Sequence, residues 1–206
     1  MSLKLTSYFF VNALEENFLN YYDTPEPFFE YHHQTGELMT VLVIENKDTW
    51  FTFRKLMQAT GKNSISGTEI YVLLYGEGNK ITKQGALEEY RAAMLGGQGG
   101  QGGQAARFLY FGDLDWEGIR LFFRTREANP SLDIKPFVSL YRLMLELAQS
   151  VELPKSLDQR GVTGPLHEFL SLLGLTEESG LNSILAEGRY IPQEIVNYQV
   201  AAKILK

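Results

Sequence analysis

The stretch YFGDLDWEGI, residues 110–119, contains two carboxylates whose spacing suits metal chemistry. Asp113 and Asp115 follow a short apolar segment, residues 107–111, that is typical of a buried strand. In an open α/β sheet, ligands bind at the carboxyl ends of the strands. Two acids one residue apart at such an end can share a divalent cation, and oxygen ligands suit Mg²⁺ or Mn²⁺. A structural role fits as well: Asp115 as the N-cap of the next helix and Asp113 as a solvated turn residue.

Two other strand-like segments also end in residues that suit a site. Residues 38–44, LMTVLVI, are almost entirely apolar, as a strand buried on both faces should be, and Glu45 follows them. Residues 69–75 form a similar segment that leads into Gly76 and Gly78. The ends of neighbouring parallel strands lie side by side, so we expect Glu45 and the two aspartates to converge on one ion, with carboxylates within about 5 Å of one another. Glycines at this edge allow backbone N–H groups to approach a phosphate.

Helix-like segments alternate with these strands. A helix capped by Asp48 and a helix over residues 82–95 are predicted after the first two strands, and another follows Asp115. Residues 133–138 are predicted to form a fourth strand, with an amphipathic helix behind it. This alternation predicts the α/β class, with a mostly parallel four-stranded sheet flanked by helices.

The pattern changes at three places along the chain. Beyond Val151 the strand signal disappears, and helices are predicted to begin near Pro165, Thr176 and Pro192. The repeat GGQGGQGGQ has no side chains able to pack, so it is predicted to be a flexible insertion rather than a phosphate-binding loop. The predicted organisation is an N-terminal extension at 1–37, an α/β domain at 38–150 with the insertion at 96–104, and a helical C-terminal appendage at 151–206.

Composition narrows the classes of function. A chain of 206 residues with 44% hydrophobic content can bury a sizeable core. The absence of cysteine excludes disulfides and thiolate metal sites and favours an intracellular, cytoplasmic setting. No apolar run approaches the roughly 20 residues of a membrane span, so no membrane partner is expected. The net charge of −6 argues against a general nucleic-acid coat protein but not against a nuclease whose acids hold a metal ion.

Three motifs, in chain order, resemble those of the Toprim family. VLVIENKDTWFTF begins at Val41, LLYGEGNK at Leu73 and YFGDLDWEGIRLF at Tyr110. They resemble the glutamate motif, the glycine turn and the DxD motif of the Toprim domain, as in the A subunit of type IIB topoisomerases. The chain is still more similar to the Toprim-like C-terminal domain of the Wadjet plasmid-defence nuclease subunit and to related bacterial proteins, which also share a late segment like RYIPQE, residues 189–194. The resemblance covers roughly residues 38–140 well and the C-terminal helices loosely.

The resemblance implies a Toprim-type nuclease that depends on Mg²⁺ or Mn²⁺ and hydrolyses a phosphodiester, most simply of DNA, with metal-activated water. Asp113 and Asp115 would hold the metal, and Glu45 would ligate it or act as a general acid or base. Without metal, the acids should repel one another and raise at least one pKa. The other candidates are phosphate contacts from Gly76, Gly78, Lys47 and Lys80, and an additional carboxylate from Glu194.

Some of these candidates have equally simple structural explanations. Both Lys47 and Lys80 are equally well explained as solvated lysines at the start of a helix. Glu194 is expected on the first turn of the last helix, where an acid is favoured by the helix dipole. The adjacent His32 and His33 point in different directions in any regular structure, so they suit a polar surface better than a metal site.

The chain departs from the topoisomerase pattern at its start. Type IIB topoisomerases attack DNA with a tyrosine on a winged-helix domain, and fewer than forty residues precede the glutamate strand here. Hydrolysis is therefore expected rather than covalent strand passage. No Lys/Arg-rich segment is present, so we expect DNA to be delivered by a partner protein or complex, or to be held through self-association. The N-terminal aromatic residues between Tyr8 and Tyr22 form a candidate docking surface, although core packing explains them equally well.

Three rival interpretations use similar motifs. Aspartate-nucleophile phosphatases also place DxD after a buried strand, but on their first strand and usually with Thr or Val where this chain has Glu117. A glycosyltransferase can use DxD for the metal of a sugar nucleotide, which leaves the glutamate and glycine motifs unexplained. A non-catalytic, Toprim-shaped binding or assembly module of a DNA-processing complex agrees with the acidic charge.

Overall fold

The structure is a computed structural model of the 206-residue chain and describes residues 27–33, 38–96, 105–156, 165–176 and 179–206. The predicted N-terminal aromatic segment and nearly all of the Gly/Gln insertion lie outside the described residues. Within those ranges, no helix combines the length and apolar character that a bilayer span requires.

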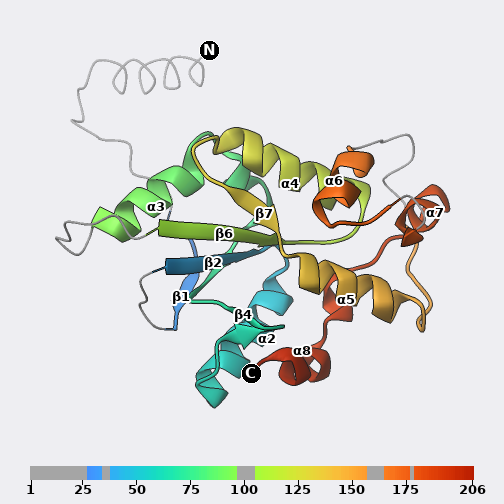
Figure 1. The fold of residues 1–206 in the computed structure, drawn as a ribbon, viewed down its shortest axis with the longest axis horizontal. Helices are drawn as coiled ribbons and strands as arrows, with labels where there is room; N and C mark the ends of the chain where they lie inside the picture. Colours follow the sequence, from blue (N-terminus) through green and yellow to red (C-terminus); the bar gives the residue numbers. More distant parts are fainter. Residues whose placement is uncertain (1–26, 34–37, 97–104, 157–164, 177–178) are drawn as a thin grey trace, which may run out of the picture.

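A mixed sheet of five strands forms the centre of the fold, in the order β1-β5-β2-β6-β7 (Figure 1). Strands β5, β2, β6 and β7 are parallel, whereas β1 pairs antiparallel with β5. The α/β class and a mostly parallel sheet flanked by helices are thus confirmed, and the sheet has one strand more than predicted. The strands are β1 (Glu30–His32), β2 (Leu38–Ile44), β5 (Val72–Tyr75), β6 (Ala105–Phe111) and β7 (Ile134–Pro136).

Helices cover both faces of the sheet. In Figure 1, α3 and α4 lie on one side, and α2, α5 and α8 lie on the other. This division follows from right-handed crossovers, because β2 leads to β5 in one direction along the sheet and β5 leads to β6 and β7 in the opposite direction. The helices are α2 (Lys47–Thr60), α3 (Ala86–Gly96), α4 (Trp116–Ala128), α5 (Val138–Ala148), α6 (Leu166–Leu172), α7 (Leu181–Ala186) and α8 (Tyr198–Ile204), with 3₁₀ turns η1 (Gly78–Thr82) and η3 (Gln193–Ile195).

Aromatic side chains join the sheet to the helices around the end of β6. Tyr110 packs against Phe122 of α4 with ring centroids 5.5 Å apart, and Phe111 packs against Tyr141 of α5 at 5.4 Å. Phe169 of α6 contacts both Phe122 and Tyr141, at 5.6 and 5.3 Å. Successive β6 residues therefore anchor opposite faces, as the alternation of a strand requires. This packing fixes the position of the DxD loop that follows.

The C-terminal segment shares the hydrophobic core of the sheet. Ile191 forms an isolated bridge with Leu114, and Leu205 forms one with Ile65 in the two-stranded sheet of β3 (Ser64–Ile65) and β4 (Thr68–Glu69). All four of these side chains are buried. Described residues near the C-terminus thus pack against the α/β core, with Ile191 beside the DxD loop.

Several predicted element boundaries were wrong. Residues 69–71 are not part of β5, because Thr68–Glu69 pair locally in a turn with β3. The N-cap of α2 is Asn46 rather than Asp48, since its side chain accepts from Thr49 N–H. Likewise, residues 83–85 separate η1 from α3, so one long helix does not begin at residue 82.

The last helix also begins later than predicted. Glu194 lies in the 3₁₀ turn η3, whereas α8 begins at Tyr198 behind its own cap, Asn197, whose side chain accepts from two backbone N–H groups. Within the predicted extension, Glu30–His32 form β1 and complete the sheet.

Candidate functional site

The carboxyl ends of the parallel strands bring the predicted residues to one edge of the sheet. Ile44 pairs with Tyr75 on one side and with Phe111 on the other. The pairing continues past the strands, because Glu45 N–H donates to Phe111 O at 3.0 Å and Gly76 N–H donates to Ile44 O at 2.9 Å. Glu45, Gly76 and the start of the DxD loop are therefore neighbours, as the parallel arrangement predicted.

The carboxylate of Glu45 lies directly against Gly112. A Cβ atom built on Gly112 would be 2.3 Å from Glu45 Oε2, so a larger residue there would displace the Glu45 carboxylate. The same oxygen accepts a 2.8 Å hydrogen bond from the hydroxyl of Tyr110, which is fully buried in β6. The N–H of Gly112 donates to the Tyr141 hydroxyl at 2.9 Å. These contacts orient Glu45 toward the loop that carries the two aspartates.

Asp113 is half-buried and holds the C-terminal segment. Its Oδ1 accepts a 2.6 Å hydrogen bond from Gln193 N–H. The next residue, Leu114, exchanges two backbone hydrogen bonds with Ile191, at 3.0 and 3.1 Å. Asp113 is therefore not a solvated turn residue, and this part of its alternative structural role was wrong.

Asp115 is the N-cap of α4. Its Oδ1 accepts from Gly118 N–H at 2.6 Å, which satisfies one of the unpaired N–H groups of the first helical turn. A Cβ atom on Gly118 would be 2.4 Å from Asp113 O, so the glycine lets the DxD loop close over the helix start. The structural role predicted for Asp115 is confirmed, and any metal contact must coexist with it.

Two acids at this edge are harder to ionise than usual. The pKa of Glu45 is raised to about 7, mainly by burial; the hydrogen bond from Tyr110 opposes this rise, and the charges of Asp113 and Asp115 add to it. Burial also raises the pKa of Asp113 to about 6, opposed by its backbone hydrogen bond and reinforced by Asp115 and Glu194. The expected direction is found, although burial contributes more than repulsion.

A polar network from the C-terminal segment surrounds these acids, and it was hardly predictable from the sequence. Asn46 N–H donates to Gln193 Oε1 at 2.8 Å, and Asn46 Nδ2 donates to Glu194 Oε1 at 2.6 Å. The buried Gln193 side chain also donates to Phe111 O at 3.0 Å. Gln193 therefore joins β2, β6 and η3 at the site, and Glu194 lies close enough for its charge to act on Asp113. The available signals were the RYIPQE likeness and the asparagine directly after Glu45.

In their present conformations, the acidic side chains of this edge do not form a complete metal-binding site. Among the described residues, no group of three or more His, Cys, Asp or Glu is arranged to hold an ion. The donor chemistry nevertheless fits a hard divalent cation, because carboxylate oxygens are its preferred ligands. The charged groups that shift the pKa of Glu45 are all acidic, so the edge is a region of negative potential. The residues that would hold such a cation are Asp113 and Asp115, with Glu45 at the same edge of the sheet.

The glycine turn is strained, and its first N–H group is already used. Gly76 donates its N–H to the sheet, so that group does not reach a phosphate. Glu77 and Gly78 follow in left-handed conformations, with φ of +50° and +58°. The left-handed region costs a residue with a Cβ roughly 1 kcal/mol. Strain of this kind is concentrated at functional sites.

The two candidate lysines differ in their surroundings. Lys80 Nζ donates to Pro27 O at 2.6 Å and forms an ion pair with Glu77 at 3.2 Å, so it stabilises the chain leading into β1. Lys47 is exposed at the start of α2 and makes no ion pair with the described residues. Only Lys47 is therefore placed to meet a ligand at the carboxyl edge.

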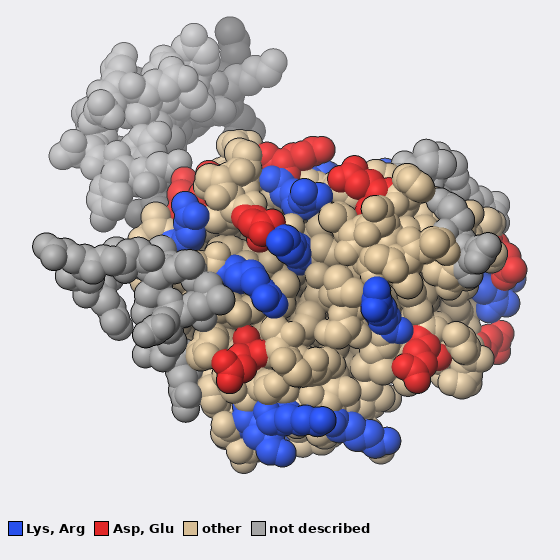
Figure 2. All heavy atoms as spheres, viewed as in Figure 1, with Lys and Arg blue, Asp and Glu red and all other residues tan. Residues whose placement is uncertain are grey.

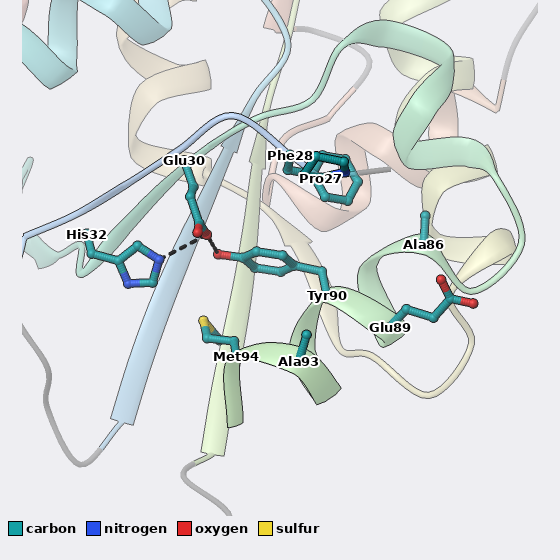
Figure 3. A pocket seen from close by; sticks show the side chains of 9 residues that line it. All are labelled: Pro27, Phe28, Glu30, His32, Ala86, Glu89, Tyr90, Ala93 and Met94. Atoms are coloured by element: carbon teal, nitrogen blue, oxygen red, sulfur yellow. Dashed lines mark hydrogen bonds and ion pairs between the residues drawn. The ribbon is translucent and has the colours of Figure 1, made fainter. Parts of the chain in front are cut away.

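A pocket of about 400 Å³ lies between β1 and α3, and none of the predicted site residues lines it (Figure 3). The Glu30 carboxylate accepts from the Tyr90 hydroxyl and is 2.9 Å from His32 Nε2. The remaining lining is mostly apolar. The full lining comprises Pro27, Phe28, Glu30, His32, Ala86, Glu89, Tyr90, Ala93 and Met94.

The face shown in Figure 2 carries basic and acidic side chains in alternation over the described residues. No continuous basic band crosses that view, apart from a small basic group over α2 and α8. Duplex DNA is held by several phosphate contacts from Lys and Arg, which this face does not offer as a continuous surface.

No protein-family model matches the chain, and no curated protein matches it. The function of the chain is therefore inferred from the geometry of the carboxyl edge.

Proposed function

We propose that this chain is a Toprim-type nuclease subunit that cleaves a nucleic-acid phosphodiester, most simply of DNA, with Mg²⁺ or Mn²⁺. The observation that carries the proposal is the meeting of Glu45 with the DxD loop at the carboxyl edge, where the glutamate lies against Gly112 and the charges of Asp113, Asp115 and Glu117 raise its pKa. A bound cation would offset the charge of the scissile phosphate and make a water molecule more acidic.

The side chains at this edge have separate tasks. Asp113 is held by Gln193 N–H and Asp115 by the start of α4, so both carboxylates are positioned before a ligand arrives. Glu45, whose pKa is raised to about 7, can accept or release a proton near neutral pH. The Tyr110 hydroxyl fixes the carboxylate that performs this transfer.

Plasmid nicking tests the proposal. The purified chain, at micromolar concentration with Mn²⁺ or Mg²⁺, is expected to nick supercoiled plasmid slowly, and Asp113→Asn is expected to abolish the nicking. Glu127→Gln, which changes an exposed carboxylate on α4, serves as the matched control. Nicking that persists unchanged in Asp113→Asn, or an absence of nicking by the wild-type chain, would contradict the proposal.

A non-catalytic Toprim-shaped module is the second candidate. It is favoured by the lack of a ready three-residue metal group in the described part of the chain, and by the use of Gly76 N–H and Lys80 within the fold. Mn²⁺ binding that depends on Asp113, without any nicking by the wild-type chain, would identify this alternative.

A further inference from the structure

A second pocket opens at the same edge of the sheet, between the start of α2 and the end of β5. Its volume is about 480 Å³. Tyr75, the last residue of β5, pairs with Ile44 at the end of β2, and Glu45 directly follows Ile44. The pocket therefore adjoins the candidate catalytic edge. It is lined by Phe29, Lys47, Trp50, Phe51, Tyr75 and Glu77.

Two of the aromatic rings that line this pocket are exposed to solvent. Phe29 is 67% exposed and Phe51 is 46% exposed, and both are among the few large hydrophobic side chains of the described residues that face solvent. Phe51 is also held edge-on against Trp50, with ring centroids 5.0 Å apart. Removing each ring from water is favourable, so exposed rings that lie close together indicate a binding surface.

The lining also carries charge. Lys47 is exposed and makes no ion pair with the described residues. Glu77, the acid of the lining, is already paired with Lys80 at 3.2 Å. The matching ligand therefore has a flat apolar face and a negative charge next to it.

We propose that this pocket binds an unpaired nucleobase of a single-stranded nucleic acid, and that the adjoining phosphate lies toward Lys47. The inference rests on the proposed function, whose substrate it specifies. Bases stack on aromatic side chains whatever their sequence, and an unpaired base exposes the face and edge that a duplex conceals. A base stacked on these rings would lie beside Lys47, which is two residues along the chain from Glu45.

Binding without metal tests the pocket separately from cleavage. The full chain in EDTA and low salt is titrated against fluorescent single strands of about twelve nucleotides, as DNA and as RNA, and against the DNA duplex. Phe29→Ala and Phe51→Ala are each expected to weaken single-strand binding at least about fivefold. Tyr198→Ala is the matched control, because Tyr198 is an aromatic of similar exposure (48%) on α8. Phe51→Tyr keeps the ring and is expected to retain the wild-type affinity.

The outcomes separate the possibilities. Weakening confined to the pocket variants supports the proposal, and the DNA and RNA strands show which sugar the pocket accepts. Equal weakening in Tyr198→Ala, unchanged affinity in both alanine variants, equal losses for the duplex, or no single-strand binding by the wild-type chain would overturn it. Because EDTA removes the metal, failure of the metal chemistry leaves these results unaffected, and a chain that nicks plasmid while both alanine variants bind normally refutes the pocket alone.

Discussion

At the scale of single residues, the two aspartates of the DxD motif have different structural roles. Asp113 fastens the C-terminal segment through Gln193 N–H, and Asp115 caps α4 through Gly118 N–H. A substitution of Asp115 that preserves the cap while removing the charge separates this structural role from a role as metal ligand.

Asp115→Asn is that substitution. Asparagine is as good an N-cap as aspartate, so the melting temperature should stay close to that of the wild-type chain. The loss of a negative ligand should weaken Mn²⁺ binding at least about tenfold, since affinity for hard cations depends on ligand charge. Calorimetric titration and thermal melting measure the two effects. Unchanged Mn²⁺ affinity would show that Asp115 is only a cap.

The pH dependence of stability should reflect Glu45 and Asp113. Because the pKa of each is raised by folding, to about 7 and about 6, the folded chain holds more protons than the unfolded chain between the two states' pKa values. Stability without divalent cation is therefore greatest below about pH 4 to 5, as far as these groups determine it, and falls as the pH rises to about 7. Each group contributes on the order of 2 kcal/mol.

Urea unfolding from pH 4.5 to 8 measures this slope. Glu45→Gln should flatten the part due to Glu45, keep an acceptor for Tyr110, and stabilise the metal-free chain at pH 8. The groups acting on Glu45 are Tyr110, Asp113, Asp115 and Glu117. A slope in Glu45→Gln as steep as in the wild-type chain would contradict the assignment, and Glu127→Gln should change nothing.

At the scale of elements, η3 is the part that completes the site. Gln193→Ala removes the bonds to Asn46 N–H and Phe111 O and leaves a small cavity. We expect a loss of about 2 kcal/mol in the free energy of unfolding, which corresponds to a fall in melting temperature of several degrees for a domain of this size. The exposed Gln199, changed to alanine, is the control and should leave the melting temperature unchanged. A fall of less than one degree in Gln193→Ala would show that η3 does not anchor the edge.

Elements with a strong apolar pattern were predictable, and those held by long-range contacts were not. The β2 strand was predicted at its observed bounds, because a strand buried on both faces is apolar throughout. Residues 69–71 misled the prediction, since Glu69 and Tyr71 fit a strand locally while Thr68–Glu69 pair with β3. Gln193 resembles any polar residue after a proline, and only its position in the fold buries it.

The candidate site was predictable in the same uneven way. The meeting of Glu45 with the DxD loop follows from parallel pairing, which the alternation of strands and helices indicated. The engagement of Lys80 with Pro27 does not follow, because its partner is 53 residues away in the chain. The caps of two helices were similarly decided by Asn46 and Asn197 rather than by the residues that seemed best suited locally.

At the scale of the whole molecule, the acidic balance predicts that the chain alone is a weak nuclease. Acidic residues outnumber basic ones by 25 to 19, and Figure 2 shows no continuous basic band. Duplex affinity at physiological salt should therefore be weaker than micromolar, and we propose that a partner protein or self-association delivers the DNA. Anisotropy titrations with and without Mg²⁺ measure this affinity. Submicromolar duplex binding together with rapid cleavage by the isolated chain would show that no partner is needed.

A metal site at the carboxyl edge is tested by titrating the chain with Mn²⁺ and following the ion by electron paramagnetic resonance. We expect the wild-type chain to bind one ion and Asp113→Asn to lose this binding while remaining folded. Binding should also weaken as the pH falls below about 6, because protons compete for Asp113 and Glu45. Equal Mn²⁺ binding by the wild-type and Asp113→Asn chains, or no binding by either, would show that no metal site exists at this edge.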